Sequence, residues 1–66
     1  MAKVDGQTVQ IGDVVCFKSD FEQTGRIVRI QGDILTLAST SDTGFSGDYI
    51  GGSEFTTEYS WDCWFD

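Results

Sequence analysis

Short runs of apolar and β-branched residues, separated by polar turns, dominate this chain of 66 residues. Three runs, 14–18, 25–30 and 34–38, have the length and composition of β-strands, with a polar loop over 19–24 and a turn over 31–33 between them. Near the N-terminus, Asp5-Gly6 stands between strand-type residues and predicts a small hairpin. No stretch has the length and period of an ordinary helix. The pattern predicts an opening hairpin followed by a three-strand meander.

The second half of the chain is less regular. Residues 39–44 and 51–53 are turn formers that predict loops, and 45–50 predict a strand that Gly47 interrupts. Residues 54–61 alternate as an amphipathic strand does, with a single helical turn near Glu58 as the alternative; the two alternating sets are Phe55, Thr57, Tyr59, Trp61 and Glu54, Thr56, Glu58, Ser60. Residues 63–66 close the chain. Five or six short antiparallel strands without a crossover helix predict an all-β fold, and a strongly bent barrel hides most of its strand edges.

The acidic residues are concentrated in the second half of the sequence. The net charge is −7, and it comes entirely from residues 33–66, which carry seven acids and no base; residues 1–32 carry four of each. Such a field repels phosphates, which disfavours direct nucleic-acid binding and favours a basic protein partner. The other interpretation is that the charge keeps an aromatic-rich domain soluble.

Size and hydropathy limit the class of protein. A chain of 66 residues allows one domain, residues 1–66, with one small core, because a domain of this size buries only about 60% of its unfolded surface. No apolar run approaches the roughly 20 residues of a membrane span, and the N-terminus lacks the apolar region of a signal peptide. These features predict a cytoplasmic protein with no membrane partner.

Seven of the nine aromatic residues also lie in the second half. So small a core does not enclose all nine, and those expected outside it are Phe45, Tyr49, Tyr59, Trp61 and Phe65. Exposed aromatics rimmed by acids are typical of interfaces for basic partners. The predicted binding site therefore consists of Asp42, Asp48, Tyr49, Glu54, Glu58, Tyr59, Trp61 and Asp62. Alternatively, the aromatics only cover a thin core.

The residues for catalysis or metal binding are largely missing from the sequence. Histidine is absent, which removes the usual base for a Ser or Cys nucleophile and the usual Cys/His zinc site. A Gly-x-Ser-x-Gly elbow would need glycine at Asp48. A calcium loop starting at Asp42 would have Gly44 and Ser53 at two principal ligand positions. We therefore expect no enzyme, no metal and no cofactor.

Residues 11–18 and 25–30 resemble the opening of KOW-type and other SH3-like small barrels. In those families a Gly-Asp turn, here Gly12-Asp13, starts the first barrel strand, and a second glycine, here Gly25, starts the next. The resemblance covers residues 11–37 and implies a small SH3-like barrel, although the basic loops of nucleic-acid-binding KOW domains are missing. First and last strands are neighbours in such barrels, which implies that Cys16 and Cys63 face each other at disulfide distance, as thiols in a reducing cytoplasm.

A wider pattern is similar to short proteins of tailed bacteriophages. It consists of three dipeptides and one glycine, with an acid, Asp66, near the last dipeptide: Phe17-Lys18, Glu22-Gln23, Gly25 and Cys63-Trp64. The similarity implies an accessory protein of the host cytoplasm that occludes a host nucleic-acid-handling protein, such as a polymerase, a nuclease or a defence factor. Its carboxylates would then stand where phosphates normally sit.

Three alternatives to this function remain open at the level of sequence. The aromatics would form a groove for a Pro-rich or Arg-containing peptide, as in SH3 adaptors. An apolar patch would instead bury itself in a structural or self-associating protein. Nucleic acid would have to bind through the one basic cluster of the chain, Lys18, Arg26 and Arg29.

Overall fold

The structure is a computed structural model that describes residues 2–18, 22–41, 44–45 and 54–65. These residues form seven strands and one 3₁₀ turn: β1 (Lys3–Val4), β2 (Gln7–Thr8), β3 (Val14–Phe17), β4 (Gln23–Gln31), β5 (Ile34–Ser39), β6 (Phe55–Tyr59), η1 (Ser60–Asp62) and β7 (Cys63–Trp64). Within the described segments, no helix has the length and apolar character needed to cross a bilayer.

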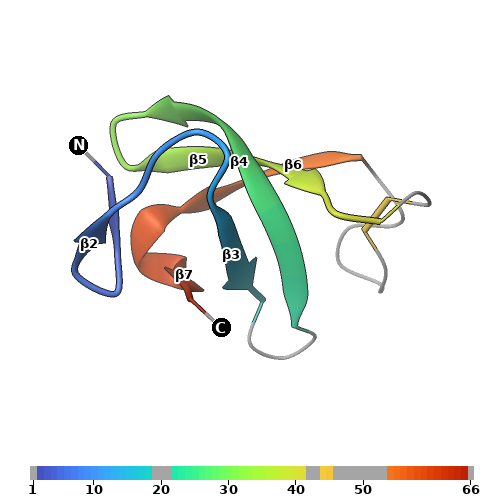
Figure 1. Cartoon of the computed structure of the whole chain (residues 1–66), viewed down its shortest axis with the longest axis horizontal. Helices are drawn as coiled ribbons and strands as arrows, with labels where there is room; N and C mark the ends of the chain where they lie inside the picture. Colours follow the sequence, from blue (N-terminus) through green and yellow to red (C-terminus); the bar gives the residue numbers. More distant parts are fainter. Residues whose placement is uncertain (1, 19–21, 42–43, 46–53, 66) are drawn as a thin grey trace.

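Five of the strands form one curled antiparallel sheet in the order β6-β5-β4-β3-β7, while β1 and β2 pair separately (Figure 1). The four strands β3 to β6 form a meander, and the chain then passes through η1 so that β7 pairs with β3 on the opposite edge. The fold is therefore all-β, with the architecture of a small SH3-like barrel, as the sequence predicts. The predicted pairing of the first and last barrel strands is confirmed as β3 with β7.

Two tight turns follow from the residues that occupy them. Asp5 and Gly6 both have positive φ, 52° and 78°, which is the backbone of the type I′ hairpin turn that Asp-Gly favours. Between β4 and β5 the first turn residue is Gly32, with φ of 59°, and a glycine at this place is typical of a type II′ turn. Both predicted turns are confirmed.

Strand β4 begins earlier than predicted. The sequence places residues 19–24 in a loop, but Gln23 and Thr24 pair with Phe17 and Cys16 in the ladder between β4 and β3. Gln23 is buried in spite of its polarity, so local polarity gave the wrong boundary and pairing with β3 decides it. The strand predicted for 45–50 lies outside the described residues except for Phe45.

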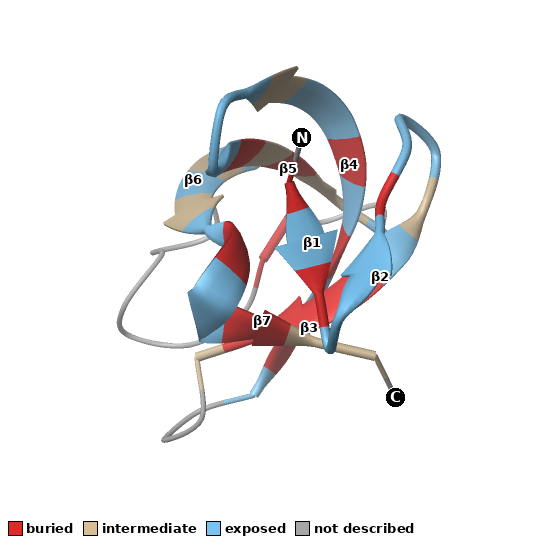
Figure 2. Cartoon of the chain, turned by 90° about the vertical axis from the view of Figure 1, so that its left-hand side faces the viewer, coloured by how far each residue is buried: buried red, intermediate tan, exposed pale blue. Residues whose placement is uncertain are grey.

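The core occupies the inner face of the curled sheet. Val15, Phe17, Ile27, Leu35 and Leu37 are completely buried there. The hairpin of β1 and β2 lies in front of the curled sheet in Figure 2, and it contributes three more buried residues to the same core, namely Ala2, Val4 and Val9. The outer face of β4, β5 and β6 is consequently the surface available to a partner.

Candidate functional site

The register between β5 and β6 decides which side of β6 faces the core. Leu35 lies opposite Glu58 and Leu37 lies opposite Thr56, and residues directly opposite each other in an antiparallel pair project to the same face. Because both leucines are completely buried, Glu58 and Thr56 face inward. The predicted alternation is confirmed over β6, including Glu58, and its aromatic side is the outer one. The predicted strand is too long at its end, because Ser60 and Trp61 belong to η1.

An aromatic surface therefore lies on the outer side of β6 and η1. We define it as Phe55, Tyr59 and Trp61 together with Ile34, which lies opposite Tyr59 on β5. The exposed fractions of the three aromatic residues are 57%, 49% and 65%, respectively. The rings of Tyr59 and Trp61 are stacked, with centroids 4.6 Å apart and planes 7° from parallel. Such a stack leaves broad ring faces and edges open to solvent.

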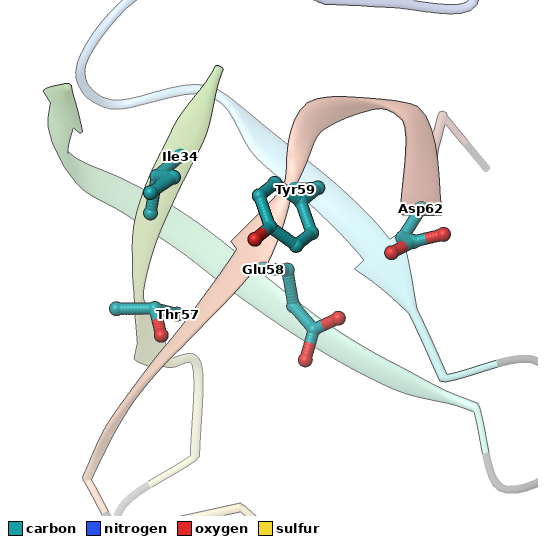
Figure 3. A pocket seen from close by; sticks show the side chains of 5 residues that line it. All are labelled: Ile34, Thr57, Glu58, Tyr59 and Asp62. Carbon is teal, nitrogen blue, oxygen red and sulfur yellow. The ribbon is translucent and has the colours of Figure 1, made fainter. Parts of the chain in front are cut away.

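A groove of about 340 Å³ lies against this surface, lined by Ile34, Thr57, Glu58, Tyr59 and Asp62. Figure 3 shows the ring of Tyr59 with Ile34 on one side and the carboxylates of Glu58 and Asp62 on the other. Two elements supply the carboxylates, since Glu58 belongs to β6 and Asp62 ends η1. The groove thus combines apolar and aromatic carbon with negative charge.

One of these two carboxylates already has a cationic neighbour within the chain. The Nζ atom of Lys18 lies 3.3 Å from Oε2 of Glu58, whose side chain is only 13% exposed. Lys18 follows β3 directly and has a positive φ of 64°. This ion pair ties the end of β3 to the inner side of β6, while Asp62 is exposed at the other end of the groove. The unburied negative charge of the groove comes from Asp62.

The two cysteines are both buried, and neither forms a disulfide. Cys63 lies opposite Phe17 and Cys16 lies opposite Trp64, and consecutive strand residues project to opposite faces. The prediction that the cysteines face each other is therefore wrong by one position in the register. Burial, and after it the charges of Glu58 and Asp62 and the neighbouring Cys16, raise the pKa of the Cys63 thiol from 9.0 to about 12.

The raised pKa favours the protonated thiol of Cys63. The thiolate is the nucleophilic form of cysteine, and a pKa of about 12 keeps Cys63 protonated at neutral pH. Its Sγ atom lies 3.5 Å from the carbonyl oxygen of Tyr59, to which it donates a hydrogen bond. Cys63 is thereby joined to the end of β6 through this hydrogen bond.

The structure brings together five residues of the predicted site, all on β6, on η1 or next to them: Glu54, Glu58, Tyr59, Trp61 and Asp62. Glu58 faces inward and is paired with Lys18, so it does not belong to an exposed acidic rim. The other three predicted residues, Asp42, Asp48 and Tyr49, lie outside the described residues.

Two aromatics expected on the surface belong to the core instead. Phe45 is 3% exposed and meets the ring of Phe17 edge to face, with centroids 5.4 Å apart. Phe65 is partly buried and packs against the core. Phe55 and Ile34 are the residues that sequence reasoning missed. Phe55 shares the alternation of Tyr59 and Trp61, which is the signal that could have identified it, whereas only pairing with β6 places Ile34 there.

Folding also changes the charge pattern seen along the chain. Arg26 lies opposite Ala38 and Arg29 opposite Thr36, and Ala38 and Thr36 in turn lie opposite Phe55 and Thr57. The two arginines therefore share the outer face with the aromatic residues, about 10 Å from β6 because adjacent strands are roughly 4.8 Å apart. The acidic end of this face is limited to β6 and η1.

In the segments that the structure describes, no group of three or more His, Cys, Asp or Glu side chains is arranged to hold a metal ion. Comparisons with protein-family models, with curated proteins and with solved structures found no match for this chain. The aromatic surface and its groove are therefore the features of this chain that bear on its function.

Proposed function

We propose that this protein is a non-enzymatic binding module, and that β6 and η1 bind a basic segment of a protein partner. The observation that carries the proposal is the exposed stack of Tyr59 and Trp61 beside the Asp62 carboxylate. A Lys or Arg side chain within about 6 Å of an aromatic ring face is attracted by the ring, at roughly 0.5–1 kcal/mol when exposed and more when desolvated. A nearby carboxylate adds a charge-assisted hydrogen bond.

The aromatic surface separates this function from the interpretation that the acids serve solubility alone. Charge for solubility requires no exposed aromatic stack, whereas Trp and Tyr are enriched among residues that dominate binding energy at interfaces. The groove beside the stack has room for one or two partner side chains. A peptide-binding groove and an acidic docking surface, which the sequence left as alternatives, coincide on β6 and η1.

The partner class that fits best is a basic, extended arm of a nucleic-acid-handling protein. Such arms are rich in Lys and Arg and normally lie against phosphates, and a protein of net charge −7 attracts them over long range. Together with the resemblance to phage proteins, this supports occlusion of a host polymerase, nuclease or defence factor in the host cytoplasm.

Nucleic-acid binding is less well supported. Lys18 is engaged with Glu58 near the inner side of β6, so the predicted cluster of Lys18, Arg26 and Arg29 is divided between two faces of the sheet. Two arginines on a protein of this net charge release few counterions from a phosphate backbone, which leaves little affinity at physiological salt.

Isothermal titration with synthetic nonapeptides tests the proposal. We expect an Arg- and Lys-rich peptide to bind, its Glu-rich counterpart not to bind, and affinity to fall with salt. Trp61→Ala should weaken binding about tenfold, since truncating a central aromatic contact costs at least about 1 kcal/mol. Asp62→Asn should weaken it several-fold. The matched control Glu22→Gln removes one exposed acid outside β6 and η1 and should leave affinity unchanged.

Three results would contradict the proposal. Equal binding of the acidic and basic peptides would remove the role of charge. Full affinity in Trp61→Ala would remove the role of the aromatic surface. Tighter binding of a single-stranded oligonucleotide than of the basic peptide, lost on changing Arg26 and Arg29 to Ala, would assign the outer face to nucleic acid instead.

A further inference from the structure

We infer that the basic segment binds as an added β-strand along the free edge of β6; this inference deepens the proposed function and rests on it. Strand β6 is the last strand of the sheet on its side, and among the described residues no strand pairs with its outer edge. A sheet edge of this kind presents unpaired N–H and C=O groups that a further extended chain can bind.

The hydrogen bonds between β5 and β6 establish which backbone groups are free. The N–H of Ser39 donates to the carbonyl oxygen of Glu54 at 2.9 Å, and the N–H of Ser60 donates to that of Asp33 at 2.8 Å. Both bonds join directly opposed positions at the two ends of the ladder, because the register pairs Ala38 with Phe55 and continues in steps of one. Hydrogen-bonded and non-hydrogen-bonded pairs alternate along an antiparallel ladder.

This alternation assigns every position of β6. Residues 54, 56, 58 and 60 direct their N–H and C=O groups toward β5, in phase with the two bonds at the ends. The residues between them, Phe55, Thr57 and Tyr59, direct these groups away from β5. The carbonyl oxygen of Tyr59 already accepts the hydrogen bond from Cys63, so Tyr59 offers its N–H alone to the edge. The same three residues place their side chains on the outer face, and two of them, Thr57 and Tyr59, line the groove.

The charges beside this edge favour a cationic strand as its occupant. Successive side chains of an added strand would point alternately to the outer and inner sides of the sheet. On the outer side they would meet the rings of Phe55 and Tyr59, and on the inner side they would approach Glu58, with Asp62 at the end of the groove. Lys or Arg at alternate positions, pointing to the outer side, complements the exposed rings and the Asp62 carboxylate at the end of the groove, while Glu58 keeps its ion pair with Lys18.

A second copy of the same chain fits this edge poorly. Two copies paired through β6 would bring the acidic residues of one strand end near those of the other copy, namely Glu54, Glu58 and Asp62, with a net charge of −7 on each copy. An inward-facing charge on an edge strand is also a recognised obstacle to edge-to-edge association, and Glu58 is such a charge. The negative charges therefore disfavour pairing of β6 with β6 of a second copy and favour pairing with a positively charged strand.

Pairing through the backbone can be tested separately from charge. The probe is a nonapeptide with Arg or Lys alternating with Thr or Val, compared with the same peptide carrying N-methyl groups on alternate residues, in each of the two possible phases. The side chains and the charge of the peptide are unchanged, but methylation in one of the two phases removes the N–H groups that face β6. We expect that phase to bind at least tenfold more weakly and the other phase to bind nearly as well as the unmodified peptide.

Amide hydrogen exchange and one variant provide matched readouts on the protein. On binding the unmodified peptide, the amides of Phe55, Thr57 and Tyr59 should gain protection, while those of Thr56 and Glu58, already bonded to β5, should change little. Thr57→Pro removes one edge-facing N–H without removing a bond to β5, since proline is tolerated on a strand edge whose N–H faces solvent. With far-UV circular dichroism unchanged, it should lower affinity about tenfold.

The outcomes separate the two proposals. If the two methylated peptides bind with equal affinity, and the three amides gain no protection, strand addition is overturned while the proposed function stands. Failure of every basic peptide to bind would overturn both. A dimer in analytical ultracentrifugation that protects the same amides without peptide would overturn the choice of partner in favour of a second copy.

Discussion

Replacing one phenylalanine at a time distinguishes the core from the aromatic surface. Phe45 and Phe55 both lie in the acidic half of the chain, ten positions apart. Phe45 is 3% exposed and packs edge to face on Phe17, whereas Phe55 is 57% exposed and lies opposite the small side chain of Ala38. The same substitution, Phe→Ala, should therefore have very different effects on the free energy of unfolding at the two positions.

The expected difference follows from what each ring contacts. Truncating a buried phenylalanine removes its transfer free energy and leaves a cavity, which together cost about 3–5 kcal/mol. At Phe55 the loss is mainly a cross-strand contact, about 0.2–1 kcal/mol relative to an Ala–Ala pair. Phe45→Ala should thus be less stable than Phe55→Ala by at least about 2 kcal/mol.

Urea unfolding followed by far-UV circular dichroism measures both variants against the unchanged protein. In a domain of 66 residues, each kcal/mol corresponds to about 4–8 °C in Tm, so thermal melts give a second reading. If Phe45→Ala does not fold, Phe45→Leu and Phe55→Leu give the same ranking with smaller losses. Equal losses at the two positions, or a larger one at Phe55, would refute the assignment of β6's aromatic side to solvent.

Three further substitutions test the packing, the alkaline behaviour and the hairpin. Gly25→Ala would place a Cβ atom 2.9 Å from the Cβ of Leu37, so we expect a loss of about 1–3 kcal/mol from overpacking, seen as a lower urea midpoint. The pKa of Cys63 is about 12 in the folded protein and returns to 9.0 on unfolding. The contribution of the protonated thiol to the free energy of unfolding is therefore fully present below pH 9 and is lost as the pH rises toward 12. In Cys63→Ser, the urea midpoint should lack this part of the decline between pH 8 and 11. Asp5 has a positive φ of 52°, and its Oδ2 accepts a hydrogen bond from the N–H of Phe65 at 2.8 Å, so Asp5→Ala should cost about 1–2 kcal/mol, and Asp5→Asn, which tolerates that φ, much less. An unchanged urea midpoint in Gly25→Ala would contradict overpacking. An alkaline decline in Cys63→Ser identical to that of the unchanged protein would contradict the role of the thiol, and equal stability of the two Asp5 variants would contradict the role of the positive φ.

The charges on the outer face limit how the proposed basic partner would approach. Along the sequence all four bases lie in residues 1–32 and seven of the eleven acids lie in residues 33–66, which suggests one acidic surface. In the fold, Arg26 and Arg29 share the outer face with the aromatic residues, so a cationic segment is attracted at β6 and η1 and repelled at β4. This gradient favours an approach along the edge of the sheet over docking on the centre of its outer face, in agreement with strand addition.

Local sequence was sufficient for the elements and turns of this fold. The Asp5-Gly6 turn depends on backbone preferences of two residues, and the strands β3, β4 and β5 depend on short β-branched runs, so both were predictable without knowledge of the rest of the chain. The start of β4 was not predictable from local sequence, because Gln23 is polar and becomes part of a strand only through its pairing with Phe17. Boundaries depend on partners that lie far away along the chain.

The alternation of 54–61 was likewise evident in the sequence, but its direction was not. An alternating strand has two faces, and which of them is buried depends on register: one residue of slip between β5 and β6 would exchange the aromatic side for the side of Thr56 and Glu58. Leu35 and Leu37, completely buried on β5, set that register. Register likewise decides the position of the cysteines, because Cys16 and Cys63 are offset by one residue in the pairing of β3 with β7.

The sequence by itself therefore determined the fold class, the turns, the acidic net charge and the absence of histidine from residues 1–66, because these depend on composition and on contacts between near neighbours. Only the tertiary structure decided that Phe45 belongs to the core, that Phe55 and Ile34 join Tyr59 and Trp61 on the surface, and that Glu58 turns inward to Lys18. The physical reason is that burial and pairing are properties of strand register, which is established between segments distant in sequence.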